Sequence, residues 1–352
     1  MNRSFQTTLD PFMPQTIEEA LEATRPSSLP REEELTTYYI PRSDKGYKTF
    51  RSSLLSKVPL GGGFRGLLSG QRGVGKTTVI LRFAKEIREF ITIRYLEAGD
   101  YLDPTQPLNY EAILFLLNCG LKGGRVEAIE TDLKKLSRNI QDEESALGRP
   151  FLIVIDGLDR RTKELAQLMN EIGAQLKNLF VRLLFTAQPA PEWAETKLVD
   201  IFDSIDFLPG LPTSSSLERL PWIEEVVRRR VKENILDDKL LKAIGFYSAG
   251  IPREALVNTH RSLQNTMKEG ILRLTPSHLT QILDERANRL LARANEDMLN
   301  SLKLAKEGSL ADKTSLYTLL FYNLLIQYGD TQPEYKVHPI IARALKWGYH
   351  EL

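Results

Sequence analysis

The sequence has one cysteine, few histidines and no long apolar run. The single Cys119 excludes an intramolecular disulfide and any metal site built from several cysteines. It lies in the apolar run AILFLLNCG, which predicts a buried structural thiol. The four histidines show no metal-ligand spacing. No stretch approaches the roughly 18–20 apolar residues that span a bilayer, and the first residues contain no apolar signal segment, so we expect a cytoplasmic protein without membrane contact.

The chain also lacks an excess of either charge. Its 47 Lys+Arg and 46 Asp+Glu give a formal net charge of +1 over 352 residues. This balance excludes a protein that binds nucleic acid through its overall field, but it leaves a local basic patch open. Arg228, Arg229 and Arg230 form one basic run on an expected helix. Exposure to solvent is the default expectation for them, with contact to phosphates or to a neighbouring protomer as alternatives.

The order of apolar and polar segments predicts the fold. Residues 1–35 combine prolines with acidic groups and few apolar residues, so we expect an arm that is flexible or packs on another surface. Over 36–210, apolar strands alternate with amphipathic helices, the pattern of a parallel α/β sheet. After a Pro/Ser-rich connector nearly everything indicates helix, which predicts a helical lid over 211–280 and a small C-terminal helical module over 281–352.

The same patterns predict individual elements. The expected strands are 66–70, 91–99, 150–156 and 181–187. The expected helices of the α/β part are one within 38–58, after an entry loop, and those over 76–90, 109–121, 126–140 and 163–179. Later helices are expected over 222–234, 237–250, 252–270, 276–305, 313–329 and 340–348, with a turn and strand before the last of these. His338 precedes Pro339 at that last helix start, which favours a capping or packing histidine.

The strongest motif is a phosphate-binding loop, Gly70-Gln71-Arg72-Gly73-Val74-Gly75-Lys76-Thr77, which matches GxxxxGK[ST]. An apolar strand precedes it and an amphipathic helix follows it, as this motif requires. Glycines allow backbone N–H groups to approach phosphate oxygens, and the helix N-terminus adds positive potential. Lys76 is expected to reach the β- and γ-phosphates of ATP, and Thr77 to ligate Mg²⁺. The expected nucleotide-binding residues here are Gly70, Gly73, Val74, Gly75, Lys76, Thr77 and Thr78.

Carboxylates end a second apolar strand. Asp156 follows the run FLIVI and is the second expected Mg²⁺ ligand, opposite Thr77. Asp159 is the next carboxylate. It is expected to orient the attacking water, with capping of the following helix as the alternative. Arg160 and Arg161 come next; one could serve a neighbouring subunit's nucleotide, although exposed, solvated arginines are the commoner case.

Polar groups at two further places are candidates for contact with phosphate. Thr186 and Gln188 end a later strand, where they could sense the γ-phosphate or only form a turn. In SAGIPRE, Pro252 starts a helix and Arg253 lies in its first turn, where a cation opposes the helix dipole. This unfavourable position points to a contact of Arg253 with nucleotide phosphate.

These motifs together resemble the AAA+ and STAND branch of P-loop ATPases over residues 36–265. GQRGVGKT resembles Walker A, LIVIDGLD the Walker B of STAND and NACHT-like proteins, LLFTAQP sensor 1, and SAGIPRE the sensor 2 of AAA+ lids, including Orc/Cdc6-like proteins. TYYIPR, with Tyr39, Pro41 and Arg42, is similar to the entry segment that contacts adenine. The end of the chain is similar to a winged-helix-like module. The resemblance implies an α/β P-loop NTPase core with an all-α lid and that module.

Three departures from the family pattern affect the expected function. Many AAA+ ATPases place Glu directly after the magnesium-binding Asp, whereas this chain has Gly157 there, so hydrolysis is expected to be slow or partner-stimulated if Asp159 is badly placed. Gln188 stands where STAND proteins often carry Arg, and no effector domain is attached.

The resemblance implies a switch ATPase that assembles as a homo-oligomer with nucleotide and regulates a separate effector, with bacterial defence or signalling as a setting by analogy. A DNA-associated regulator, replication-initiator-like or transposition-regulator-like, and a non-hydrolysing nucleotide-bound scaffold remain the alternatives.

Overall fold

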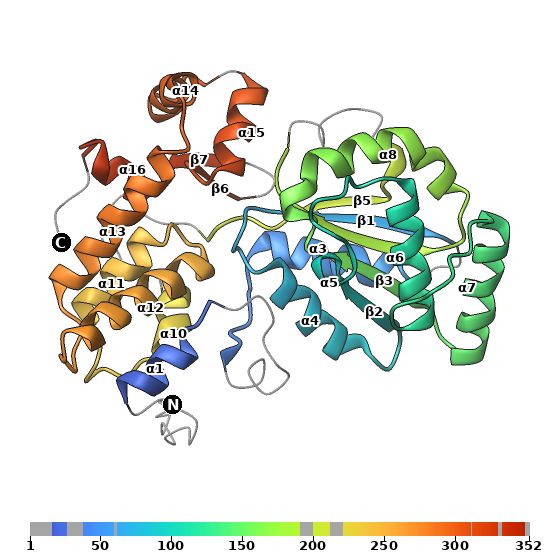
Figure 1. The fold of residues 1–352 in the computed structure, drawn as a ribbon, viewed down its shortest axis with the longest axis horizontal. Helices are drawn as coiled ribbons and strands as arrows, with labels where there is room; N and C mark the ends of the chain where they lie inside the picture. Colours follow the sequence, from blue (N-terminus) through green and yellow to red (C-terminus); the bar gives the residue numbers. More distant parts are fainter. Residues whose placement is uncertain are drawn as a thin grey trace, which may run out of the picture.

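The computed structural model describes residues 16–26, 38–59, 62–190, 200–211, 221–310, 312–329 and 333–348. An α/β part containing a parallel sheet lies beside a mostly helical part, which contains the later helices and α1 (Figure 1). No helix within the described ranges is both long and apolar enough to cross a membrane.

The main sheet has five parallel strands in the order β2-β3-β4-β1-β5. The strands are β1 Phe64–Ser69, β2 Thr92–Glu97, β3 Phe151–Asp156, β4 Arg182–Ala187 and β5 Ser204–Phe207. The first four coincide with the expected strands to within a few residues. β5 was not predicted from the sequence, because SIDF carries a serine and an aspartate that are both buried in the structure. Every residue of β1, β3 and β4 is buried, which explains their nearly continuous apolar sequence.

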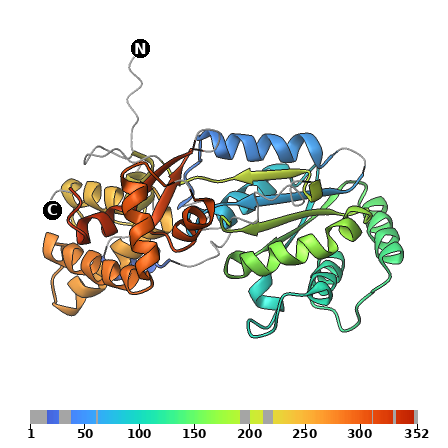
Figure 2. The same ribbon diagram turned by 90° about the horizontal axis from the view of Figure 1, so that it is seen from above.

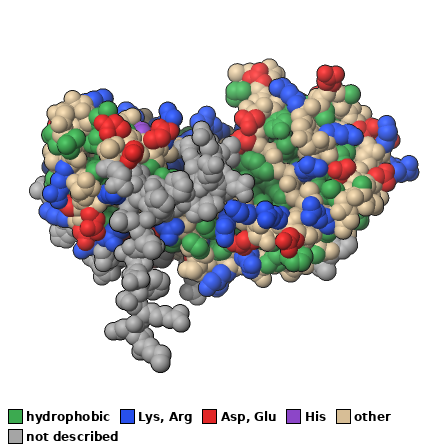
Figure 3. All heavy atoms as spheres, turned by 90° about the horizontal axis from the view of Figure 1, so that it is seen from below, with side chains coloured by type: hydrophobic (Ala, Val, Ile, Leu, Met, Phe, Trp, Pro, Cys, Tyr) green, Lys and Arg blue, Asp and Glu red, His purple; other side chains and the backbone are tan. Residues whose placement is uncertain are grey.

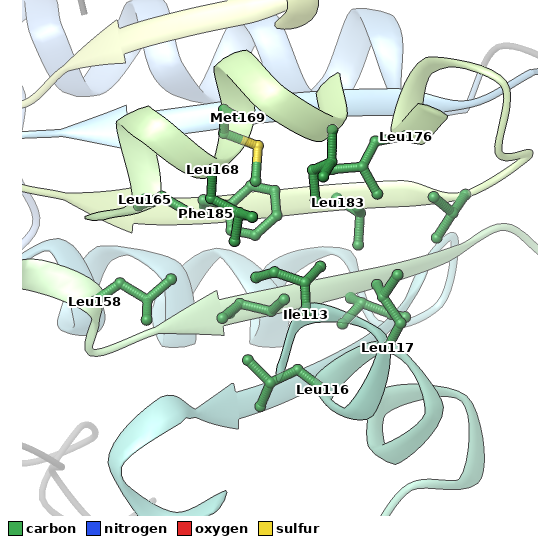
Figure 4. Close-up of a cluster of buried hydrophobic side chains, with 14 of the residues drawn as sticks. Ile113, Leu116, Leu117, Leu158, Leu165, Leu168, Met169, Leu176, Leu183 and Phe185 are labelled. Carbon is green, nitrogen blue, oxygen red and sulfur yellow. The ribbon is translucent and has the colours of Figure 1, made fainter. Parts of the chain in front are cut away.

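Helices cover both faces of this sheet. α3 Lys45–Lys57 and α4 Lys76–Ile87 pack on one face. α6 Tyr110–Lys122, α7 Leu133–Leu147 and α8 Thr162–Lys177 pack on the other. Figure 2 shows the sheet between the blue helix α3 and the yellow-green helix α8. Between α6, α8 and the sheet lies a dense apolar cluster (Figure 4) that includes Ile113, Leu117, Met169 and Phe185.

Local sequence sets the ends of these helices. α6 begins after Asn109, whose side chain accepts a hydrogen bond from Ala112 N, and it ends at Gly123 in the left-handed conformation. The helix expected over 126–140 instead begins at Leu133, because the Asp132 side chain caps it. Two short elements also went unpredicted, α5 Ala98–Tyr101 and the 3₁₀ helix η1 Leu158–Arg161.

The helical part contains α10 Pro221–Arg228, α11 Asp238–Tyr247, α12 Pro252–Lys268 and α13 Pro276–Leu291, which we call the lid. α1 Ile17–Ala23 packs against α12, with Ile17 and Ala20 in the apolar core of the lid. This segment of the expected arm therefore packs on another part of the chain. Residues 1–15 and 27–35 of the arm lie outside the described residues.

The chain ends in a module formed by α14 Glu296–Lys306, α15 Lys313–Phe321, the antiparallel hairpin β6 Leu325–Tyr328 and β7 Glu334–Val337, and α16 Pro339–Ala344. Two predictions need correction here. The helix expected over 276–305 is broken where Asn295 caps α14. The helix expected over 313–329 stops at Phe321, since Asn323 has a positive φ of 55° and LIQY then forms β6. The expected boundary at residue 280 also lies inside α13.

Candidate functional site

The phosphate-binding loop connects β1 to α4 and is shaped by its glycines. Gly73 and Gly75 have φ of +91° and +99°, a left-handed conformation that residues with a Cβ rarely adopt. α4 begins at Lys76 without a side-chain cap, so its first N–H groups have no side-chain acceptor. A helix N-terminus of this kind is a site for phosphate. Val74 is buried, and Thr78 lies in the first turn of α4.

Lys76 points back into the loop. Its Nζ atom donates to Gly70 O at 2.7 Å and to Gln71 O at 3.4 Å, and it forms an ion pair with Asp159 Oδ1 at 3.0 Å. Only 5% of Lys76 is exposed. The structure thus brings together the lysine of the loop and the carboxylate that follows the Asp156 strand.

Asp156 is the centre of a hydrogen-bonded group at the carboxyl end of β3. Its Oδ2 accepts from Thr77 Oγ1 at 2.5 Å and lies 2.7 Å from the hydroxyl of Tyr95, while Oδ1 accepts from Thr186 Oγ1 and from Gly157 N at 2.8 Å. The predicted proximity of Thr77 and Asp156 is therefore observed, and Thr186 contacts the same carboxylate. This hydroxyl and carboxylate are the hard oxygen donors that Mg²⁺ prefers.

Tyr95 and Glu97 belong to this site and were missed by sequence reasoning. Glu97 ends β2 in register with Asp156, and the Tyr95 hydroxyl lies 3.2 Å from Glu97 Oε2. Burial, followed by the nearby charge of Asp156, raises the pKa of both Tyr95 and Glu97. The available signal was a glutamate at the end of a β-branched strand, but the sequence does not tell which strand pairs with β3.

The lid contacts the loop directly. Pro252 is the first residue of α12, and Arg253 N donates to Gly73 O at 3.3 Å. A Cβ built on Gly73 would lie 2.7 Å from Arg253 Cβ, so this approach requires glycine. The Arg253 guanidinium forms no hydrogen bond or ion pair with the described residues. The structure therefore places Arg253 next to the loop, as its unfavourable helix position suggested.

Several arginines gather around the loop. The pKa of Arg72 is lowered, first by burial and then by the positive charges of Arg253 and Arg160, with a smaller effect from Arg293. Asp159 opposes this shift. Three cations, from η1, the lid and the residues just after α13, thus repel Arg72 of the loop, and a polyanion beside Arg72 would offset this repulsion. Arg293 gave no signal in the sequence.

Arg42 of the entry segment joins the phosphate-binding loop to the residues that follow β5. The buried Arg42 donates to Val74 O at 2.8 Å, to Pro209 O at 2.9 Å and to the Asp44 carboxylate at 2.6 Å. The guanidinium of Arg82 lies 5.4 Å from the ring of Tyr39, whose pKa burial raises to about 12. Pro41 is exposed, and its carbonyl accepts from Trp222.

The C-terminal module also reaches the loop, through Gln71. Its Nε2 lies 2.8 Å from Leu325 O and 3.2 Å from both Leu320 O and Asn323 Oδ1, and its Oε1 accepts from Gln327 N at 3.0 Å. Gln71 is fully buried. A variable position of the motif therefore fastens the phosphate-binding loop to the β6 hairpin.

Other predicted residues have contacts of their own. Arg161 donates to Asp103 O and Gln106 O, so it is committed within the chain. Gln188 is buried, and its backbone N–H is bound by Thr162. Cys119 is fully buried, as predicted.

The basic run and the late histidine also pack against the chain itself. Each arginine of the run is half-buried: Arg228 pairs with Asp238, Arg229 donates to Tyr39 O, and Arg230 lies over the Tyr38 ring. The expected solvent exposure is thus observed in part, because the Arg228 and Arg229 side chains remain 32% and 39% exposed. His338 caps α16 and is fully buried, which confirms the predicted capping and packing role.

The glycine-rich loop between β1 and α4, with Thr77 and Asp156 side by side at the carboxyl ends of parallel strands, defines a P-loop NTPase fold. No protein-family model and no curated protein sequence matches the chain. Solved structures do match. The ADP form of the ORC2 protein of Aeropyrum pernix is 14% identical, with a TM-score of 0.53 over 88% of this chain and 94% of that one. Cdc6p from Pyrobaculum aerophilum is 12% identical, with a TM-score of 0.50 over 93% and 98%.

These two structures share the fold along nearly the whole chain. The predicted fold class, an α/β P-loop NTPase core followed by an all-α lid and a C-terminal module, is confirmed, and so is the resemblance to the Orc/Cdc6-like type. At this identity the likeness concerns the fold.

Proposed function

We propose that this chain binds ATP with Mg²⁺ and hydrolyses it as an AAA+/STAND-type switch. The observation that carries the proposal is the convergence of Lys76, Thr77 and Asp156 on one loop, with four arginines nearby. Backbone N–H groups of the loop would hold the phosphates, and Lys76 would exchange its partners for the β- and γ-phosphates. Thr77 and Asp156 would hold Mg²⁺, which neutralises phosphate charge when bound.

The arrangement of the parts supports a switch. The α/β core would hold the nucleotide, the lid helices α10 to α13 would cover it through Arg253, and the C-terminal module from α14 onward would respond through Gln71. Both contacts reach the loop in this structure. Because the lid and the module both contact the loop that would hold the phosphates, nucleotide binding would change their relation to the core. A homo-oligomer and a separate effector remain part of the proposal, and a pull-down with ATP present would identify such partners.

Replacing Lys76 tests the nucleotide site. Lys76→Ala should abolish ATP binding or turnover, because the charge that faces the phosphates is lost. Binding of a fluorescent ATP analogue and phosphate release are the measurements. Lys122→Ala, at an exposed position in the last turn of α6, makes the same change outside the site and should match the wild type. Unchanged binding and hydrolysis in Lys76→Ala would refute the site.

A second candidate function is a DNA-associated regulator. The shared fold of the ORC2 and Cdc6p structures supports it. The engagement of Arg228, Arg229 and Arg230 within the chain weakens one expected DNA contact. On the face in Figure 3, basic and acidic side chains are intermingled. DNA binding that requires ATP and weakens steeply with salt would establish this function. Its absence at low salt would exclude it.

A further inference from the structure

The Glu97 carboxylate fills space that a side chain at position 157 would otherwise occupy. β2 and β3 are parallel, and Glu97 pairs with Asp156 at the last position of both strands. Registered side chains of neighbouring strands point to the same sheet face. The Glu97 side chain therefore lies on the face of Asp156 and Thr77, at the carboxyl edge of the sheet where the phosphate-binding loop begins.

Gly157 and Glu97 fit each other sterically. Gly157 has a φ of +83°, and a Cβ built on it would overlap Glu97 Oε1. A residue with a side chain after Asp156 would thus displace the Glu97 carboxylate. The chain places a carboxylate beside the magnesium-binding position from the neighbouring strand, not from the residue after Asp156.

The two oxygens of Glu97 have different surroundings. Oε2 lies 3.2 Å from the Tyr95 hydroxyl, whose single hydrogen has a nearer acceptor in Asp156 Oδ2 at 2.7 Å, and Oε1 accepts no hydrogen bond from any described residue. Asp159, the other carboxylate near the site, is paired with Lys76 at 3.0 Å. Glu97 therefore keeps an oxygen that can accept a hydrogen bond at the carboxyl edge of the sheet.

We propose that Glu97 orients the water that attacks the γ-phosphate of ATP. This inference rests on the proposed hydrolysis. Oε1 accepts a hydrogen bond from the water, and the water oxygen forms a bond to the γ-phosphorus. The bond from that phosphorus to the β–γ bridging oxygen breaks, and its electron pair leaves with ADP. One water proton passes to an oxygen of the released phosphate, so Glu97 ends the step unchanged.

Glu97→Gln tests the assignment, because it keeps the size of the side chain while weakening the acceptor. We expect kcat for ATP to fall about 10²-fold or more, in the range of a lost positioned acceptor. The Kd of ATP should stay within about threefold of the wild type, since an interaction with the attacking water contributes little to ground-state binding. Glu89→Gln is the matched control, because Glu89 is exposed beyond the end of α4.

The outcomes separate this inference from the proposed function. A wild-type protein that binds ATP but never hydrolyses it would overturn the proposed hydrolysis, and this inference with it. A hydrolysing wild type with an equally active Glu97→Gln variant would overturn the inference alone. The same holds if Asp159→Asn abolishes turnover while Glu97→Gln retains it, because the role then belongs to Asp159. Loss of ATP binding in Glu97→Gln would also overturn it.

A second pair of variants uses Gly157. Gly157→Ala should lower the Tm through its positive φ, and its Cβ should also move the Glu97 carboxylate aside, which costs little because that carboxylate ends a flexible side chain. The kcat for ATP should therefore fall in Gly157→Ala, and the same substitution in a Glu97→Gln background should lower kcat by a smaller factor. Equal fold-losses of kcat in the two backgrounds would show that Gly157 and Glu97 act independently, and this would overturn the inference.

Discussion

Replacing Gln71 by alanine would remove the side-chain hydrogen bonds that join the phosphate-binding loop to the C-terminal module. The Gln71 amide has two hydrogens and one acceptor oxygen, which serve backbone groups of the β6 hairpin such as Leu325 O and Gln327 N. Three buried hydrogen bonds at about 1 kcal/mol each give a loss of about 3 kcal/mol. The stranded Leu325 and Gln327 groups add to this loss unless water reaches them.

Urea unfolding followed by circular dichroism measures this loss, and limited proteolysis shows where it acts. We expect Gln71→Ala to shift the urea midpoint downward and to make the segment around β6 and β7 easier to cleave. Gln175→Ala, at an exposed position on α8, removes the same side chain where it serves no such contact. Surface changes of this kind usually stay within about 0.5 kcal/mol.

The reasoning fails if the two variants behave alike. A Gln71→Ala protein with the urea midpoint and the cleavage pattern of Gln175→Ala would mean that the hairpin is held to the loop by its apolar contacts alone. Ile326 and Tyr328 of β6 do lie in the apolar cluster that contains α3 and α4. Gln71→Met, which keeps volume without hydrogen bonds, separates the polar contribution from the packing.

Two further predictions concern stability. Burial and the nearby Arg286 lower the pKa of His338 to about 3. Below about pH 6.5 the histidine of the unfolded chain therefore binds a proton, whereas His338 of the folded chain stays neutral down to about pH 3. Stability should be fully present above about pH 6.5 and fall by about 1.4 kcal/mol per pH unit between 6.5 and 3. His338→Asn keeps an acceptor for Ile340 N and should flatten the pH dependence of the urea midpoint; parallel curves would contradict this. Ile17→Ala should cost about 2 kcal/mol, because Ile17 is 4% exposed in the lid core. Leu272→Ala, exposed by 76%, should cost almost nothing in the same unfolding assay, and equal losses would show that α1 is not docked.

Most of the α/β core could be predicted from the sequence. Strands β1, β3 and β4 are apolar because helices cover both sheet faces, so their composition alone identified them. β5 escaped because Ser204 and Asp206 are buried polar residues that bond to each other. β6 escaped because its apolar residues continue those of α15, and a short apolar run has no period that separates helix from strand.

The candidate site was predicted where its residues belong to local motifs, including the more distant motifs that contain Thr186 and Arg253. Residues 70–78 and 156–159 lie in contiguous motifs, and the loop and Asp156 were found from them. Glu97 and Tyr95 lie at the site because β2 pairs with β3. Arg293 lies near Arg72 because of the way the later part of the chain packs on the core. Such pairings depend on the whole fold, which local patterns do not encode.

The hydrogen bond between Gln71 and Gln327 joins residues that are 256 positions apart. On a ribosome that adds about 5–20 residues per second, the loop would wait roughly 13–50 seconds after its own synthesis for this partner. During that interval the side-chain N–H groups and the side-chain oxygen of Gln71 both lack their final hydrogen-bond partners. The loop thus gains its hydrogen bonds to the hairpin only after the last part of the chain has been synthesised. If translation arrests or stops before β6, the complete motif is present but these hydrogen bonds cannot form.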